Sequence, residues 1–281
     1  MTGGRAPALA FSTLACPEWD AETVVGRAVR FGYDGVEWRG GPDGTVRTSW
    51  SKRHRADLCR SMERAGLASI AVTAYSNLVG PEPDLRRASV DAIADHAELA
   101  RDLGAGVVRI FIGTRDDEAP DPVVTERAVD GIRRALDRVR PTGVVLAVEP
   151  HDDHVRAAAL RPILAAIPDP SLGVVWDIAN GWAAGESPAD GFGAYAGRIR
   201  YVQVKDGVGR GSAWRLVELG RGEVPIDRAL TALRAWTAGR PDAPPPISVE
   251  WERAWHPELA PADVALPAAR AWLVDHLGMP W

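Results

Sequence analysis

The stretch Val144-Val-Leu-Ala-Val-Glu149 joins five apolar residues to a carboxylate at the point where the run ends. Continuous apolar runs of this length are typical of strands that are buried on both faces of a parallel sheet. A second run, Gly173-Val-Val-Trp-Asp-Ile178, has the same form and also carries an acid near its end. Such runs, repeated with helix-length segments between them, indicate a parallel α/β fold.

Eight such runs occur along the chain, with amphipathic segments between many of them. The predicted strands are residues 9–14, 35–38, 69–75, 107–112, 144–149, 173–178, 201–205 and 247–251. The predicted helices are residues 21–31, 53–65, 85–103, 125–140, 225–238 and 262–277. Eight strands favour a closed (β/α)8 TIM barrel over an open doubly wound sheet, which usually has fewer strands. No linker interrupts the series, so we expect one domain over residues 1–281.

Composition argues against several classes of protein. A net charge of −5 and a pI near 5.7 give no basic field for a polyanion, so we expect no nucleic-acid partner. Cys16 and Cys59 fit no metal or redox spacing, and we expect both to be reduced. No segment has the length and apolarity of a membrane span, which predicts a soluble, cytoplasmic protein without a membrane partner. A homo-oligomer remains open.

Oxygen-bearing side chains occur at the ends of the last four predicted strands, where barrels of this kind place their active sites. They are Glu149, Asp177, Gln203 and Glu250. A single carboxylate there can simply cap the next helix, but three buried acids together need a compensating charge. A divalent cation supplies that charge. Because all four side chains offer oxygen, we predict one ion, Mn²⁺ or Mg²⁺ in preference to zinc.

Four motifs then resemble the xylose isomerase-like TIM barrel superfamily. They are Val-Glu-Pro-His at 148–151, Trp-Asp-Ile-Ala-Asn at 176–180, Val-Gln-Val-Lys-Asp at 202–206 and Ser-Val-Glu-Trp-Glu at 248–252. The superfamily, also described by its AP endonuclease 2-like domain, includes sugar phosphate isomerases and epimerases, inosose and 3-dehydroshikimate dehydratases, and endonuclease IV. The resemblance extends over most of the chain and implies that Glu149, Asp177, Gln203 and Glu250 bind a single metal ion.

Two positions depart from the pattern of many members, which have His where this chain has Gln203 and Asn180. The dehydratases of the superfamily resemble this chain at Gln203, which favours lyase chemistry slightly. The change at Asn180 removes a possible acid or base and leaves a candidate substrate contact.

The remaining candidate residues follow from strand periodicity and residue type. Lys205 lies two residues after Gln203, so both face the same side, and it is one of two lysines among 33 basic residues. It therefore suits a role as a titratable ammonium or as a charge beside an oxyanion. His151 is a candidate for orienting substrate or moving a proton. Arg109 interrupts an apolar strand, which leaves two interpretations, a pair with Glu37 or an anchor for substrate.

Eleven tryptophans are many for this length, and most of them should pack in the core. Trp19 and Trp251 are the candidates for apolar walls around a sugar. The segment 208–215 is glycine-rich and basic, so it is either a phosphate-binding loop or a mobile lid.

These residues suit a metal-dependent isomerase or epimerase acting on a sugar, keto-sugar or cyclitol. A metal chelated by a carbonyl and its neighbouring hydroxyl would acidify the adjacent C–H, and Glu149 and Glu250 would carry the proton. Loss of a β-hydroxyl, assisted by Lys205 or His151, would instead make the protein a dehydratase. Endonuclease IV-like DNA repair is a remote alternative because it needs several metal-binding histidines. A non-catalytic sugar-binding barrel is a further one.

Overall fold

The computed structural model describes residues 8–115, 118–119, 121–238, 240 and 243–277. Within these ranges eight parallel strands close into a barrel in the order β1-β10-β7-β6-β5-β4-β3-β2, which confirms the predicted (β/α)8 fold. The barrel strands are β1 (Leu9–Ser12), β2 (Gly35–Arg39), β3 (Ala68–Thr73), β4 (Val107–Ile110), β5 (Val145–Val148), β6 (Leu172–Asp177), β7 (Ile199–Val204) and β10 (Ile247–Val249). The two ends of the predicted domain, residues 1–7 and 278–281, lie outside the described residues.

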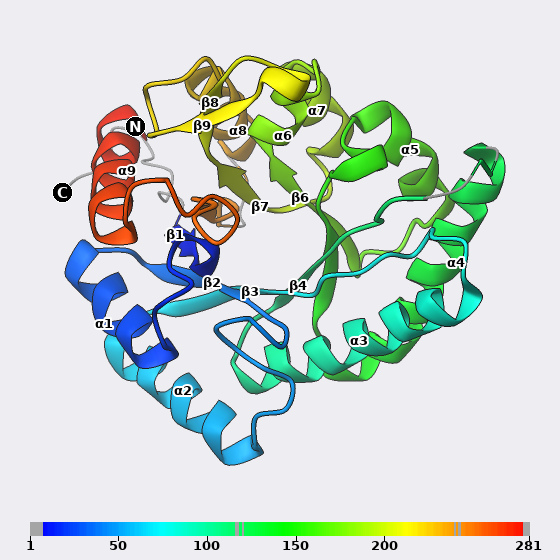
Figure 1. Cartoon of the computed structure of the whole chain (residues 1–281), viewed down its shortest axis with the longest axis horizontal. Coiled ribbons are helices and arrows are strands. Elements are labelled where there is room, and N and C mark those ends of the chain that lie inside the picture. The colour runs from blue at the N-terminus through cyan, green and yellow to red at the C-terminus, as the bar shows by residue number, and fades with distance from the viewer. Residues whose placement is uncertain (1–7, 116–117, 120, 239, 241–242, 278–281) are drawn as a thin grey trace.

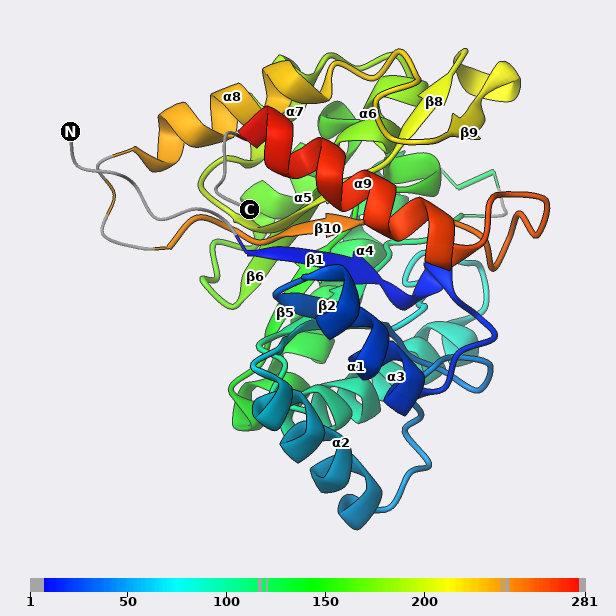
Figure 2. The same ribbon diagram turned by 90° about the vertical axis from the view of Figure 1, so that its left-hand side faces the viewer.

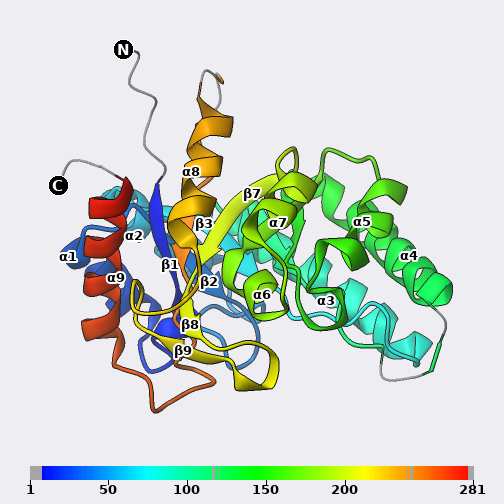
Figure 3. The ribbon, with the colours of Figure 1, turned by 90° about the horizontal axis from the view of Figure 1, so that it is seen from above.

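Helices surround the strands, with α1 and α9 on one side of the barrel and α4 and α5 on the opposite side (Figures 1 and 3). Their bounds are α1 (Ala21–Phe31), α2 (Lys52–Ala65), α3 (Pro83–Asp102), α4 (Asp121–Val139), α5 (Ala157–Ala166), α6 (Ile178–Ala183), α7 (Pro188–Tyr195), α8 (Ile226–Thr237) and α9 (Ala262–Leu277). The six predicted helices correspond to α1 to α4, α8 and α9. The helices α5 to α7 are not among the predicted ranges; all three are short, and α5 contains Pro162.

The barrel interior changes from apolar to polar along its axis. A small cluster on the inward face contains Ala10, Ala71, Ala147, Val175 and Tyr201. The side chains of this cluster fill the interior, whereas the apolar residues on the outward face pack against the helices. Charged side chains occupy the barrel near the C-terminal ends of the strands. The predicted strands 69–75 and 107–112 end two residues early in the structure, which leaves Tyr75 and Phe111 on the loops beyond β3 and β4.

A two-stranded hairpin, β8 (Asp206–Val208) and β9 (Arg215–Val217), follows β7 and lies at the end of the barrel toward which β1 and β10 point (Figure 2). The carboxylate of Asp206 accepts hydrogen bonds of 2.9 to 3.2 Å from the backbone N–H groups of Gly207, Gly220, Gly222 and Val224. A Cβ at Gly222 would lie 2.1 Å from Asp206 Oδ1, so glycine is required for this close approach. Asp206 therefore fixes both ends of the segment between β7 and α8.

No described helix combines the length and apolarity needed to cross a bilayer. Cys16 and Cys59 are both free thiols.

Replacing Asp206 with Asn should lower the free energy of unfolding by about 1–3 kcal/mol, because an amide turns an N–H group toward backbone donors and leaves them unpaired. Urea unfolding followed by fluorescence measures the change. Asp137→Asn, at an exposed position on α4, is the matched control and should leave stability unchanged. Equal stability of the two variants would contradict this role for Asp206.

Candidate metal site and active-site cavity

Three carboxylates converge inside the barrel near the C-terminal ends of the strands. Glu149 follows β5, Asp177 ends β6 and Glu250 follows β10, so strand pairing brings residues that are far apart in sequence to one place. One carboxylate oxygen from each lies within 4.8 Å of the others, and all three side chains are buried. This spacing is compatible with a metal ion held between them.

Gln203 on β7, the predicted fourth ligand, lies beside this cluster. Its Nε2 donates to Glu250 Oε1 at 2.8 Å and to Glu37 Oε1 and Oε2 at 3.1 and 3.3 Å. Its Oε1 is buried and has no hydrogen-bond partner. A buried acceptor without a donor is costly, and a cation would satisfy it. The donor set therefore fits a divalent metal, with oxygen ligands throughout.

Two buried cations lie among these acids. Arg109 Nη1 is 2.6 Å from Glu250, 2.7 Å from Glu149 and 3.3 Å from Glu37. Arg109 makes the predicted pair with Glu37 and also pairs with two predicted metal ligands. Its role as an anchor for substrate stays a prediction. Its pairing with core acids explains how a guanidinium stays charged inside a strand.

Lys205 Nζ is the second cation, at 2.9 Å from Asp177, 2.6 Å from Glu250 and 2.5 Å from Glu252. Glu252 received no role from the sequence, although it lies two residues after Glu250. The alternation that places Gln203 and Lys205 on one face would have found it.

The acids differ in how readily they take up a proton. Burial raises the pKa of Glu149 to about 8, and Arg109 only partly offsets that effect. Burial acts in the same direction on Glu250, but Lys205 and Arg109 together hold the pKa of this carboxyl below its usual value. For Lys205, burial opposes the charge, yet the pKa of the ammonium is raised well above its usual value by Asp177, Glu250 and Glu252.

A cavity of about 420 Å³ opens above this cluster. Glu149, Glu250, Arg109 and Lys205 line its inner part. Its rim includes Leu14, Tyr75, Ser76, Phe111, His151, Asp152, Glu252, Trp255 and His256. The rings of Tyr75 and Phe111 stack at 5.7 Å between centroids, and Trp255 meets Tyr75 edge-on at 6.3 Å. The cavity thus combines a charged base with an aromatic wall.

Residues 25–275 match the family model described as the xylose isomerase-like TIM barrel. The chain belongs to this family. Three of the four motifs that carry the sequence resemblance supply residues that line the cavity, and the motif at 176–180 supplies Asp177 of the acidic cluster beneath it. A search of curated protein sequences finds no significant match to the chain.

Several solved structures share this xylose isomerase-like fold. The IOLI protein, whose structure contains a bound zinc atom, is 18% identical, with 96% of this chain and 98% of that chain covered and a TM-score of 0.79. A D-tagatose 3-epimerase-like protein is 17% identical, with 96% and 97% covered and a TM-score of 0.79. The probable 3-DHS dehydratase AsbF from Bacillus anthracis is 16% identical, with 95% and 98% covered and a TM-score of 0.77. At these identities the similarity establishes the fold.

The structure brings two further predicted site residues to this region of the barrel. His151 lies at the cavity rim, where its Nδ1 is 2.8 Å from Asp152 and its ring meets Phe111 edge-on. Burial lowers the pKa of His151, but the hydrogen bond to Asp152 and the negative charges of Glu149 and Asp152 together outweigh that effect, so the net shift is upward. Asn180 Nδ2 donates to Glu149 Oε1 at 3.0 Å, so the contact it makes is with a predicted ligand.

The two tryptophans predicted to wall the cavity are elsewhere. Trp251 is buried in the outer core and its Nε1 donates to the carbonyl of Ala260, because alternation along the chain turns Trp251 outward when Glu250 points inward. Trp19 packs beside Phe31, with Arg27 over its ring. Both placements correct the sequence-based expectation. Tyr75, Phe111 and Trp255 form the aromatic wall instead, and they follow strand ends, where periodicity no longer applies.

The basic segment 208–215 forms most of the β8–β9 hairpin, and Arg210 lies over the ring of Trp182 at 3.7 Å. The position of the Arg210 guanidinium is explained by its contact with the face of Trp182, without a lid or a phosphate site.

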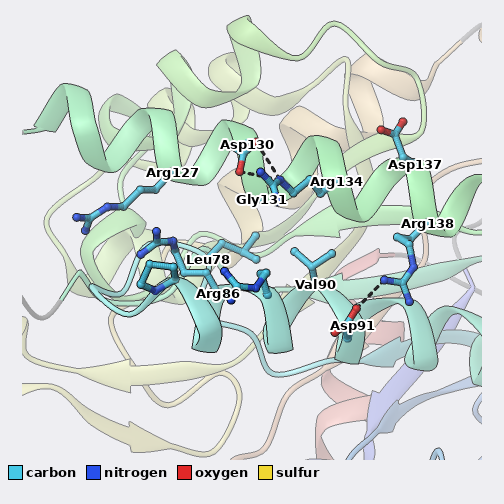
Figure 4. A pocket seen from close by; sticks show the side chains of 12 residues that line it. Leu78, Arg86, Val90, Asp91, Arg127, Asp130, Gly131, Arg134, Asp137 and Arg138 are labelled. Carbon is cyan, nitrogen blue, oxygen red and sulfur yellow. Dashed lines mark hydrogen bonds and ion pairs between the residues drawn. The ribbon is translucent and has the colours of Figure 1, made fainter.

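A second cavity, of about 440 Å³, lies between α3 and α4 on the outside of the barrel and is rich in arginine. Figure 4 shows Arg138 paired with Asp91 and Arg134 paired with Asp130. Arg86 donates to the carbonyls of Gly80 and Pro81. Of these contacts, the pair of Arg138 with Asp91 joins the two helices, and the cavity contains none of the predicted ligands.

Replacing Lys205 with Met should reduce the stability of metal-free protein by about 3–5 kcal/mol, because it leaves Asp177, Glu250 and Glu252 without their shared cation. Chemical unfolding in the presence of a chelator measures this loss. Lys52→Met removes the other lysine, which is exposed at the start of α2, and should change stability little. A stable Lys205→Met variant would show that the acids do not depend on the ammonium.

Proposed function

We propose that the protein is a divalent-metal-dependent isomerase or epimerase that acts at a carbon next to a carbonyl in an uncharged sugar, keto-sugar or cyclitol. The observation that carries this proposal is the cluster of Glu149, Asp177 and Glu250, with the unpaired oxygen of Gln203, at the base of a cavity with an aromatic wall. The similarity in fold to a D-tagatose 3-epimerase-like protein supports it.

Oxygen ligands favour Mn²⁺ or Mg²⁺ as the ion, although the structure of the IOLI protein contains zinc. A bound ion would polarise the substrate carbonyl and acidify the neighbouring C–H. Glu149, Asp177, Gln203 and Glu250 are the residues proposed to hold it.

The proton transfers are assigned to Glu149 and Glu250. These carboxylates come from β5 and β10, which are separated in the barrel by β6 and β7, so they approach the substrate from different directions. One carboxylate removes the proton and the other returns it, either to the opposite face of the same carbon or to the neighbouring carbon. Asn180 fixes the orientation of Glu149 through its hydrogen bond. Lys205 lies 2.6 Å from Glu250 and provides a positive charge near the oxygen that becomes negative.

The charge distribution favours an uncharged substrate. Each of the two buried cations that line the cavity, Arg109 and Lys205, already contacts three carboxylates. A carboxylate or phosphate on the substrate would compete with those acids for the cations. Hydroxyl groups do not, and the rings of Tyr75, Phe111 and Trp255 suit the C–H faces of a polyol.

A dehydratase is the second candidate. Lys205 and His151 both line the cavity; His151 can supply a proton to a departing β-hydroxyl, and Lys205, whose raised pKa keeps it charged, can stabilise the departing oxygen. The fold similarity to AsbF supports this candidate. The carboxylate of 3-dehydroshikimate argues against it, because Arg109 and Lys205 are already paired with carboxylates of the protein. The DNA-repair hypothesis gains no support, since the one group of three or more potential metal ligands found among the described residues contains no histidine.

Incubation of Mn²⁺-loaded protein with a panel of ketoses and keto-cyclitols in D₂O should incorporate deuterium at the carbon next to the carbonyl, and chelation should abolish the exchange. Proton NMR detects the exchange and identifies a new epimer or isomer. A conjugated product that absorbs in the ultraviolet would instead establish dehydration. If no member of the panel shows either deuterium exchange or a conjugated product, the proposal is refuted.

In the Glu250→Gln variant the exchange rate should fall about 10²- to 10⁴-fold, because an amide cannot accept the substrate proton. The rate of deuterium incorporation under saturating metal provides the measurement. Glu126→Gln, exposed on α4, carries the same chemical change away from the cavity and should retain full activity. Undiminished turnover in Glu250→Gln would remove Glu250 from the proton transfer.

A further inference from the structure

A fourth acid, Glu37, lies inside the barrel and has no role in the chemistry proposed above. It is on β2 and completely buried. Its carboxylate accepts hydrogen bonds from Ser248 Oγ at 2.8 Å and from Tyr201 Oη at 3.0 Å, in addition to the two contacts with Gln203 Nε2. Donors from β7 and β10 thus fix the position of this carboxylate tightly.

The ion pair with Arg109 is only one part of the environment of Glu37. Arg109 lies closer to Glu149 and Glu250, at 2.7 and 2.6 Å, than to Glu37, at 3.3 Å. The shortest contacts of Glu37 are with neutral donors. These neutral donors satisfy the lone pairs of the buried carboxylate that Arg109 leaves free, and they hold it in one orientation.

The amide of Gln203 can face either way, and its neighbours decide which way it faces. A carboxylate accepts hydrogen bonds and cannot donate them, so the NH₂ group must face Glu37 and Glu250. The amide oxygen is then the atom left unpaired. If Glu250 binds a metal, part of its bonding capacity is used there, whereas every contact of Glu37 is with the protein.

We propose that Glu37 is a positioning residue that holds the Gln203 amide with its oxygen, and not its nitrogen, directed to the metal. The inference rests on the proposed metal site. Residues that orient metal ligands typically change metal affinity 10- to 100-fold when they are replaced. At this position the need is specific, because an amide offers one atom that binds a metal and one that does not, and the two differ little in size.

Glu37→Gln tests the proposal because the new amide both donates and accepts, so it no longer dictates the orientation of Gln203. The dissociation constant for Mn²⁺, measured by calorimetry on protein first stripped with chelator, should rise about 10- to 100-fold. Glu252→Gln is the matched control, since it removes one negative charge from the same cluster and leaves the contacts of Gln203 in place. It should change the affinity much less.

The exchanged variant, Glu37→Gln with Gln203→Glu, separates orientation from simple damage to the barrel. Its total charge is that of the natural protein, the new amide can donate to the new carboxylate, and a carboxylate offers oxygen in either orientation. Most of the Mn²⁺ affinity should therefore return. Unchanged affinity in Glu37→Gln, an equal loss in Glu252→Gln, or no recovery in the exchanged variant would each overturn the proposal.

A readout without metal distinguishes failure of this inference from failure of the proposed function. In ¹⁵N-glutamine-labelled, metal-free protein, the side-chain NH₂ signals of Gln203, assigned by their loss in Gln203→Glu, should show slow exchange with solvent. Glu37→Gln should abolish that protection and Glu252→Gln should preserve it. If the natural protein keeps the protection but binds no divalent ion, the metal site fails and the orientation by Glu37 stands. If the protection is absent, the inference itself fails.

Discussion

The balance of buried charge at the mouth of the barrel is the constraint on which the rest of the site depends. Glu149, Asp177 and Glu250 lie together with little access to water, and desolvation of such a cluster is expensive unless each charge is matched. Arg109 and Lys205 provide part of the match by bridging three carboxylates each. Acids still outnumber cations, and the proposed metal ion would add a further positive charge. The same arrangement occupies the cations that would otherwise recognise an anionic substrate.

The barrel explains how such a cluster can be held rigidly. Each strand contributes one or two inward side chains, and hydrogen bonding between adjacent strands fixes their relative heights, as with Asp177 beside Gln203 on β6 and β7. Small residues fill the interior below, and the polar layer rests on them. The aromatic wall is arranged differently, because Tyr75, Phe111 and Trp255 lie on loops beyond the strands. In barrels of this type the loops after the strands vary while the barrel is kept, which lets one fold act on different substrates.

The loops themselves are held by buried polar contacts. Asp206 binds backbone N–H groups at both ends of the segment between β7 and α8, and thereby fixes the hairpin beside the site. Beyond β10, Trp251 turns outward into the core, while Trp255 on the same loop lies at the cavity rim with Arg39 against its ring. One loop thus has one tryptophan that anchors it and another that lines the cavity.

The sequence by itself determined the barrel and the acids of its site, because apolar runs of strand length and a polar residue at each strand end are local patterns set by the two-residue period of a strand. The same period predicted that Lys205 would accompany Gln203. Only the tertiary structure decided what those residues contact. Glu37 and Gln203 are 166 positions apart, and their hydrogen bond depends on the size of the closed barrel and on which residues point across it. The aromatic wall was likewise beyond the sequence, since Tyr75 and Trp255 lie on loops whose path is set by packing against distant elements.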